Sequence, residues 1–199
     1  MSFTKLDYDL FQMINQLGDK VSFLNPLMRL FASQAEYVFY LGIVIYWFMK
    51  KGSHRRMVTE AILSACLAFM GSVLISKVYY EDRPFVSHHV LQLISHPANA
   101  SFPSDHAIGA FVIATTIWLH HRKAGRLWLV LAGCIALSRV WTGVHYPSDV
   151  IGGAIIGAIA ACVVHRVFKR SPLALKWMNQ VIQWYGKIES KIWRGSALK

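Results

Sequence analysis

The stretch SRVWTGVHYPSDVIGGAIIGAIAACVV, residues 138–164, joins a polar cluster to a long apolar run. Within twelve residues it places Ser138, Arg139, His145 and Asp149, and no charged residue follows before its end. An apolar run of this kind is typical of a membrane helix. Small residues recur every four positions in the run (Gly153, Gly157 and Ala161), which favours close helix packing. We therefore predict a membrane-embedded helix with a polar site at one end.

The composition of the whole chain favours an integral membrane protein. Of the 199 residues, 55% are hydrophobic and 16% are charged, and the mean hydropathy is +0.38. The net charge of +11 fits basic cytoplasmic loops and attraction to anionic lipid. Because the basic residues do not gather on one soluble element, we expect no nucleic-acid binding. Cys66, Cys134 and Cys162 lie inside apolar runs and predict neither a disulfide nor a metal site.

Five apolar segments predict an all-α, polytopic helical membrane bundle. They are Tyr37–Met49, Met57–Ser76, Ala107–Leu119, Leu127–Leu137 with an extension to Val144, and Val150–Val164. Several are shorter than the ~17–25 residues of an ordinary span. We interpret these as helices whose polar ends enclose a site accessible to water, with re-entrant segments as the alternative.

Amphipathic segments precede and follow this core, and we expect one domain over residues 1–199. Residues 1–34 form an interfacial segment, 35–168 the transmembrane core that carries the polar site, and 171–199 a basic amphipathic tail. A sixth crossing within 6–34 is an alternative, as is a tail packed on a partner. The tail stripe is Leu173, Trp177, Val181, Trp184, Ile188 and Ile192.

Loop charge predicts the orientation of the chain. Basic residues concentrate at 50–56, at 122–126 and at 169–170, so these turns should face the cytoplasm. Alternation of the spans then puts loops 77–104 and 143–149 together on the extracytoplasmic side. We therefore expect a multi-pass plasma-membrane protein with its polar site facing outward.

Three polar clusters would meet in those outer loops. They are Lys77 with Arg83-Pro84, then Pro103-Ser104-Asp105-His106, then Ser138-Arg139 with His145 and Asp149. Together they supply cations, a hydroxyl, imidazoles and carboxylates. Cations can hold phosphate oxygens, and an imidazole can attack phosphorus or protonate a leaving oxygen. This set predicts a phosphatase, and its apolar surroundings indicate a lipid substrate.

The clusters resemble the signature of the type 2 phosphatidic acid phosphatase superfamily. Within it, the chain is similar to bacterial undecaprenyl-diphosphate phosphatases of the bacitracin-resistance type. The third cluster matches the family pattern fully. The second has Asp105 where the family has glycine, and the first has five residues between Lys77 and Arg83 where the family has six.

The resemblance implies a role for each matched residue. His145 would be the nucleophile that forms phosphohistidine, His106 the general acid, and Asp149 the carboxylate that orients His145. Substrate phosphate would be bound by Lys77, Arg83, Ser104, Ser138 and Arg139. Ser104 is also a candidate N-cap of the helix near Ala107. We place Asp105 beside the phosphate, where it would pair with a site cation or act on the leaving end of a diphosphate.

The implied reaction removes the terminal phosphate of a polyprenyl diphosphate, with no cofactor and no metal. His88, His89 and His96 share the outer loop, but their spacing matches no familiar metal motif. The implied partners are the polyprenyl lipid and the bilayer, and the sequence indicates no particular oligomeric state. Two alternatives stay open: a phosphatase for phosphatidylglycerophosphate or phosphatidic acid, and a transporter that only binds lipid phosphate.

Overall fold

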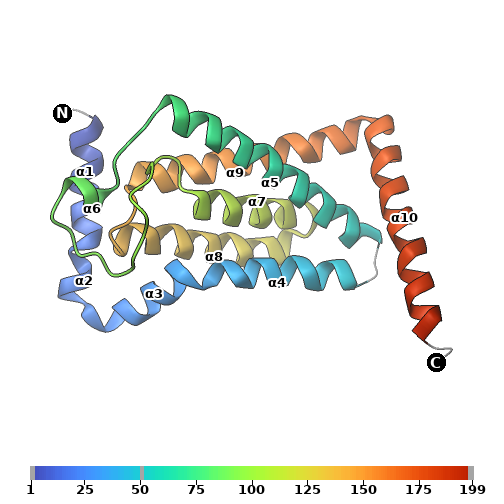
Figure 1. The fold of residues 1–199 in the computed structure, drawn as a ribbon, viewed down its shortest axis with the longest axis horizontal. Helices are drawn as coiled ribbons and strands as arrows, with labels where there is room; N and C mark the ends of the chain where they lie inside the picture. The colour runs from blue at the N-terminus through green and yellow to red at the C-terminus, as the bar shows by residue number, and fades with distance from the viewer. Residues whose placement is uncertain (1–2, 50–51, 197–199) are drawn as a thin grey trace.

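The chain folds into helices and loops, as Figure 1 shows for the computed structural model. The structure describes residues 3–49 and 52–196, with side chains for 4–49 and 52–190, and these ranges contain no strand. The all-α prediction is confirmed. The elements are α1 (Phe3–Asn15), α2 (Leu17–Lys20), η1 (Ser22–Leu24), α3 (Asn25–Ser33), α4 (Ala35–Phe48), α5 (Gly52–Val78), α6 (Pro84–Ser87), α7 (Asp105–His120), α8 (Arg122–Trp141), α9 (Pro147–Arg170) and α10 (Pro172–Ser196).

Helices α4, α5, α7, α8 and α9 form the bundle, with α7 at its centre (Figure 1). Helix α7 packs against α5, α8 and α9, and Ile108, Val112 and Ile117 are fully buried. Each predicted apolar segment therefore corresponds to one bundle helix. Helices α5, α8 and α9 are long and apolar enough to cross a membrane, whereas α4 is a shorter apolar helix. The count of five crossings stays a prediction.

The small-residue face of α9 packs against α7, as predicted. A Cβ atom on Gly157 would lie 2.7 Å from the carbonyl oxygen of Ile108, and one on Gly153 would lie 2.6 Å from that of Ser104. Real side chains do not approach this closely, so only glycine permits the two backbones to come together here. This contact fixes the start of α7 beside the start of α9.

The N-terminal helix crosses one end of the bundle (Figure 1). Its apolar residues Leu6, Leu10 and Met13 are exposed, as expected for a helix at a membrane surface. Its other face is held by protein, because Phe11 is buried and the Asn15 amide donates to carbonyl oxygens of Leu91 and Trp141, at 2.9 Å each. The interfacial position stays a prediction, but α1 also closes the bundle end.

Helix α10 runs across the opposite end (Figure 1). Trp177 and Trp184 are exposed, while Arg55 of α5 forms an ion pair with Glu189 at 2.7 Å. This exposed apolar stripe agrees with both predictions for the tail, a helix at the membrane interface and a helix packed on a partner. Some predicted features lie outside the described residues: Lys50 and Lys51, the Ile192 side chain, and residues 197–199.

The two ends of the bundle differ in the loops that they carry. One end, here the motif end, holds the loops 79–104 and 142–146. The other, here the basic end, holds the end of α4, the start of α5, and the α7–α8 and α9–α10 connections (Figure 1). His54, near the start of α5, and Lys123, near the start of α8, line one cavity at the basic end. The predicted gathering of the motif loops at one end, away from the basic turns, is confirmed.

Candidate active site

Arg83 links the two loops of the motif end through hydrogen bonds. It lies just before Pro84 in an extended conformation, as a residue that precedes proline should, and it is 4% exposed. Its Nε donates to the backbone oxygen of Asn99 at 3.2 Å and to the Asn99 Oδ1 atom at 3.0 Å, and Nη2 donates to Ala100 at 3.2 Å. Nη1 donates to the Val144 oxygen at 2.9 Å. One cation thus joins the α5–α7 loop to the α8–α9 loop.

His145 is held between this cation and a carboxylate. Its Nδ1 lies 3.1 Å from Asp149 Oδ2, and its Nε2 lies 3.0 Å from Arg83 Nη1. A guanidinium can only donate, so Nε2 is the acceptor and Nδ1 carries the proton. Burial, and then the Arg83 charge, lower the pKa of His145 well below its usual value. The ring is therefore neutral at neutral pH, with a lone pair on Nε2.

Asp149 orients this ring through a set of bonds to one oxygen. Besides His145, Oδ2 accepts from the Tyr146 amide at 2.8 Å and from the Ser101 hydroxyl at 2.5 Å. The Tyr146 bond makes Asp149 part of the N-terminal cap of α9, which is the structural role expected for a carboxylate in the first turn. Both readings of Asp149, cap and orienting carboxylate, are compatible with this geometry.

A cavity of about 270 Å³ opens beside Arg83 and His145. Residues from all three motif clusters line it, and they include Arg83, Asp105, His106 and His145. Asp105 is exposed and accepts a hydrogen bond from Ser72 Oγ at 2.8 Å. Its observed partner is therefore a hydroxyl of α5 and not a cation. His96 also lines the cavity, and its ring centroid is 6.1 Å from that of His145.

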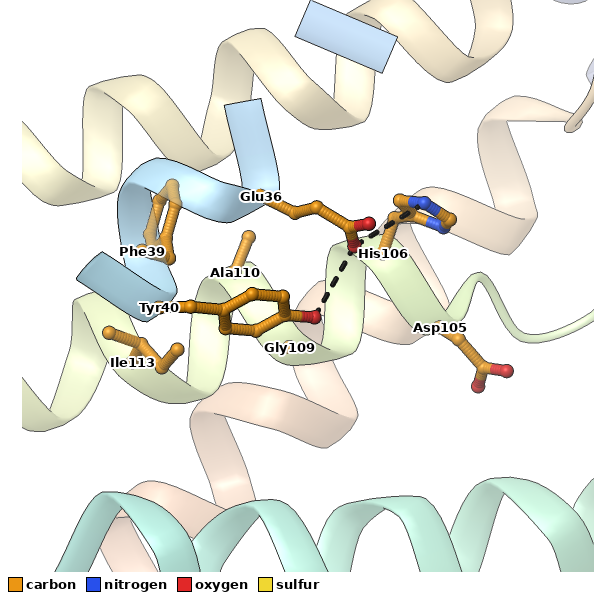
Figure 2. Close-up of a pocket in the computed structure, with 8 residues that line it drawn as sticks. All are labelled: Glu36, Phe39, Tyr40, Asp105, His106, Gly109, Ala110 and Ile113. Carbon is orange, nitrogen blue, oxygen red and sulfur yellow. Dashed lines mark hydrogen bonds and ion pairs between the residues drawn. The ribbon is translucent and has the colours of Figure 1, made fainter. Parts of the chain in front are cut away.

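His106 points toward a second carboxylate. Its Nε2 lies 3.5 Å from Glu36 Oε2 of α4, and the Tyr40 hydroxyl donates to the same oxygen at 3.3 Å (Figure 2). Figure 2 shows Asp105 turned away from this pair. His106 lies where a small cavity between α4 and α7 meets the larger one, because it lines both. Each of the two predicted catalytic histidines thus has its own carboxylate partner.

Unpartnered polar atoms gather on the predicted phosphate-binding residues. Arg139 is 2% exposed and donates from Nη1 to the Ala32 oxygen at 2.8 Å, but its Nε and Nη2 have no partner. The Ser104 hydroxyl is buried and also lacks a partner. Ser104 is the N-cap residue of α7, yet it makes no capping bond, so the predicted capping role of its side chain is wrong. The buried donors of both residues remain available to an anion.

The two other predicted ligands differ in placement. Ser138 is fully buried and its hydroxyl donates to the Ile135 oxygen at 2.7 Å within α8. Lys77 lies at the exposed end of α5 and is not among the residues that line the cavity. The structure therefore brings Arg83 and the two histidines to one cavity, and Lys77, Ser104, Ser138 and Arg139 are not among the residues that line it. The binding roles of these four residues stay predictions.

Sequence reasoning missed four polar residues of the site. Glu36 faces His106, Ser101 bonds Asp149, Ser72 bonds Asp105, and His96 was considered only as a metal ligand. The sole signal for Glu36 was its position as an acid just before an apolar run. The outer-loop histidines are also separated in space, since His88 packs on Tyr8 with ring centroids 4.1 Å apart while His96 faces the cavity.

This arrangement suits the binding of an anion next to a nucleophile. Arg83 and Arg139 supply buried positive charge, and the start of α7 offers free backbone amides and the positive end of the helix dipole. The Nε2 lone pair of His145 lies on the Arg83 side of the ring. An oxyanion held by Arg83 would bring its central atom close to that nitrogen.

Comparison with known proteins agrees with this geometry. Residues 56–172 match the PAP2 superfamily. The chain is 39% identical to the bacitracin transport permease protein BcrC of Bacillus licheniformis, over 96% of the chain and 93% of that protein. It is 32% identical to the undecaprenyl-diphosphatase BcrC of Bacillus subtilis, over 94% of the chain and 95% of that protein.

A solved structure shares the fold. The crystal structure of Aquifex aeolicus LpxE aligns with a TM-score of 0.69 and 26% identity, over 81% of this chain and 95% of that one. The family match covers the three motif clusters and more than half of the chain, and the similarity to both Bacillus proteins extends over nearly its full length. The chain therefore belongs to the PAP2 superfamily and is a multi-pass membrane phosphatase.

Proposed function

We propose that this phosphatase hydrolyses the terminal phosphate of a polyprenyl diphosphate through a phosphohistidine intermediate on His145. The observation that carries the mechanism is the position of His145, with Nδ1 on Asp149 and Nε2 beside Arg83. An imidazole fixed in this tautomer presents its lone pair to a bound phosphoryl group. The neutral form of His145, favoured by its lowered pKa, is the form that can attack.

In the first step, Nε2 of His145 attacks the terminal phosphorus, and the bond to the bridging oxygen breaks. Arg83 and Arg139 stabilise the charge on the equatorial oxygens, with the Ser104 hydroxyl as a further donor. The bridging oxygen leaves with the lipid monophosphate and takes a proton from His106. Glu36, at 3.5 Å from His106, stabilises the imidazolium before transfer.

In the second step, water attacks the phosphohistidine. Neutral His106 now accepts a proton from that water, and inorganic phosphate leaves His145. Overall, one polyprenyl diphosphate and one water give one polyprenyl monophosphate and one phosphate. Asp149 keeps the same role throughout, because its bonds to Ser101 and to the Tyr146 amide hold it in place.

The choice of a polyprenyl substrate rests on the relatives. The Bacillus subtilis relative and a 29% identical protein of Sulfolobus acidocaldarius are both named undecaprenyl-diphosphatases. The Bacillus licheniformis relative, in contrast, is named a transport permease, which favours keeping a second candidate, a carrier that binds lipid phosphate without hydrolysis. A nucleophilic imidazole with an orienting carboxylate is not needed for a carrier, so we favour the enzyme.

Phosphate release by the purified protein in detergent tests the proposal. We expect turnover of undecaprenyl diphosphate to exceed that of phosphatidylglycerophosphate and of phosphatidic acid. Vanadate should inhibit, because it can adopt the five-coordinate geometry of phosphoryl transfer, and EDTA should not, because protein cations supply the charge. Binding without release would instead support the carrier, and preference for a glycerophospholipid would change the substrate class.

We also propose that the motif end faces the extracytoplasmic side. The concentrated basic charge of the opposite end supports this orientation. Ser87 at the motif end and Ser53 at the basic end are both exposed and can each be replaced by cysteine in a chain lacking its three native cysteines. A membrane-impermeant maleimide on intact cells should label position 87 and spare position 53. The reverse pattern would place the reaction at the inner leaflet.

A further inference from the structure

The basic end of the bundle holds a second cluster of carboxylate and imidazole groups. Glu60 of α5 is 4% exposed, and its Oε2 lies 2.8 Å from His120 Nε2 and 2.8 Å from His165 Nδ1. The three residues come from α5, from the last position of α7 and from α9. Since α7 begins at the active-site cavity and rises about 1.5 Å per residue, the cluster lies roughly 20 Å from that cavity.

We propose that Glu60, His120 and His165 form a divalent-metal site suited to Zn²⁺. Their donor atoms all lie within 4.8 Å of one another. Two imidazole nitrogens and one carboxylate oxygen are ligands that Zn²⁺ prefers, with bonds of about 2.0–2.2 Å. A tetrahedral ion then needs donors about 3.3 Å apart. The two 2.8 Å contacts reach this spacing if each donor moves by a fraction of an ångström.

The direction of the two rings suits a single ion bound between them. A carboxylate has two oxygens, yet both imidazole nitrogens converge on Oε2. The His120 and His165 rings are nearly perpendicular, with centroids 5.1 Å apart, so they approach the same point from different sides. For each ring, binding would move the N–H proton to the other nitrogen and leave the lone pair toward the ion.

The cluster also has room for a further ligand. His165 lines a cavity of about 640 Å³ at the basic end, from which water can reach a fourth coordination position. Arg122, Arg166 and Lys169 line the same cavity and oppose a cation there. We therefore expect binding weaker than that of an all-cysteine structural zinc site. Because the ligands join three helices, the ion would tie their ends together and stabilise the fold without taking part in the reaction.

Metal titration of the full-length protein in detergent tests the site. After chelation and removal of the chelator, the wild type should bind one Zn²⁺ by calorimetry, and thermal unfolding should shift upward. Co²⁺ should give the visible absorption of a tetrahedral complex. Glu60→Gln and His165→Asn should each weaken binding by more than about 10- to 100-fold, the loss that is typical when only a partner of a ligand is replaced. The matched control His89→Asn, at an exposed histidine of the motif end, should bind as the wild type does.

The outcome is decided by the wild type even if a variant fails to fold. Absence of Zn²⁺ binding and of a Co²⁺ spectrum in folded wild type would overturn the proposal and leave the cluster as a hydrogen-bonded triad. Undiminished binding in folded His120→Asn/His165→Asn protein would overturn it as well, because the ion would then sit elsewhere.

Discussion

The motif end and the basic end both hold a carboxylate bonded to imidazole, but they differ in the number of rings and in the groups that surround them. At the motif end, Asp149 takes one nitrogen of His145, and the other nitrogen faces Arg83. At the basic end, one nitrogen of His120 and one of His165 both contact Oε2 of Glu60. The first arrangement directs a lone pair at a site for an anion. The second directs three donors at one point, which suits a cation.

The difference shows that residue types alone do not define a site. Histidine and acidic residues recur at both ends, yet at the motif end a guanidinium nitrogen lies 3.0 Å from an imidazole nitrogen, whereas at the basic end the two imidazole nitrogens contact a carboxylate oxygen. A phosphate needs those cations, whereas a metal ion is repelled by them. Four predictions test this contrast, and the largest effect is expected at the residue that should form the covalent bond.

Replacing His145 with alanine should lower phosphate release by at least about 1,000-fold, because no neighbouring group can take the phosphoryl transfer over. Purified variant and wild type should be compared in detergent with undecaprenyl diphosphate. The wild type should also retain acid-labile, base-stable phosphate from labelled substrate, and the variant should not. His89→Ala, at an exposed loop position, is the control and should keep full activity. Substantial steady-state turnover by the His145 variant would remove the covalent mechanism.

Glu36→Gln should reduce kcat by about 10- to 100-fold, since a neutral amide cannot stabilise the imidazolium of His106. The alkaline limb of the kcat profile should move to lower pH, because His106 then loses its proton more easily. Tyr40→Phe is the control: it removes the hydroxyl that donates to Glu36 and keeps the carboxylate. An unchanged pH profile in Glu36→Gln would show that His106 acts without this partner.

The contrast between the ends also explains what the sequence could reveal. The apolar runs predicted the bundle helices, because burial and membrane insertion both depend on local hydropathy. His145 and Asp149 were predicted together because they lie four residues apart, so one helix start positions both. Glu36 and His106 lie seventy residues apart and meet only through the packing of α4 on α7. The Glu60 cluster draws on three helices and has no local pattern at all.

Two predictions about polar groups depended on packing that a sequence does not contain. Ser104 occupies a capping position, but its hydroxyl makes no capping bond, so a preference that holds on average failed at this site. Lys77 belongs to a recognisable pattern, yet its side chain is exposed at the end of α5 and is not part of the cavity lining. Local patterns predicted which residues gather at the motif end but not the bonds of each.

The α7–α9 contact runs between the motif end and the basic end. A substitution in the middle of this contact should therefore lower the stability of the fold more than it alters the active site or the Glu60 cluster. Gly157→Ala should cost about 1–3 kcal/mol, because the new methyl would meet the Ile108 oxygen. Gly133→Ala is the matched control, since a Cβ atom there meets nothing within 4 Å. It should be neutral or stabilising by up to about 1 kcal/mol. Thermal unfolding in detergent distinguishes the two variants. Equal changes in stability would mean that the α7–α9 contact can accommodate an added methyl group.

The smallest effect concerns the buried acids of the motif end, where Glu81 lies near Asp149 and Asp7. Burial, and then these two charges, raise the pKa of Glu81 to about 7. Because the folded chain binds this proton more tightly than the unfolded chain, the resulting stability is present at acidic pH and is lost as the pH rises through about 7. Glu81→Gln stays neutral, so it should match the wild type near pH 4.5 and exceed it at pH 8. Because solvent screens the charge of a half-buried carboxylate, we expect the free energy of unfolding of Glu81→Gln at pH 8 to exceed that of the wild type by only about 1 kcal/mol. Unfolding at the two pH values measures this, with the exposed neighbour in Asp82→Asn as the control. If Glu81→Gln and the wild type differ equally at both pH values, the acids of the motif end do not repel one another, and Glu81 resembles Glu60 of the basic end, whose contacts are with imidazole groups.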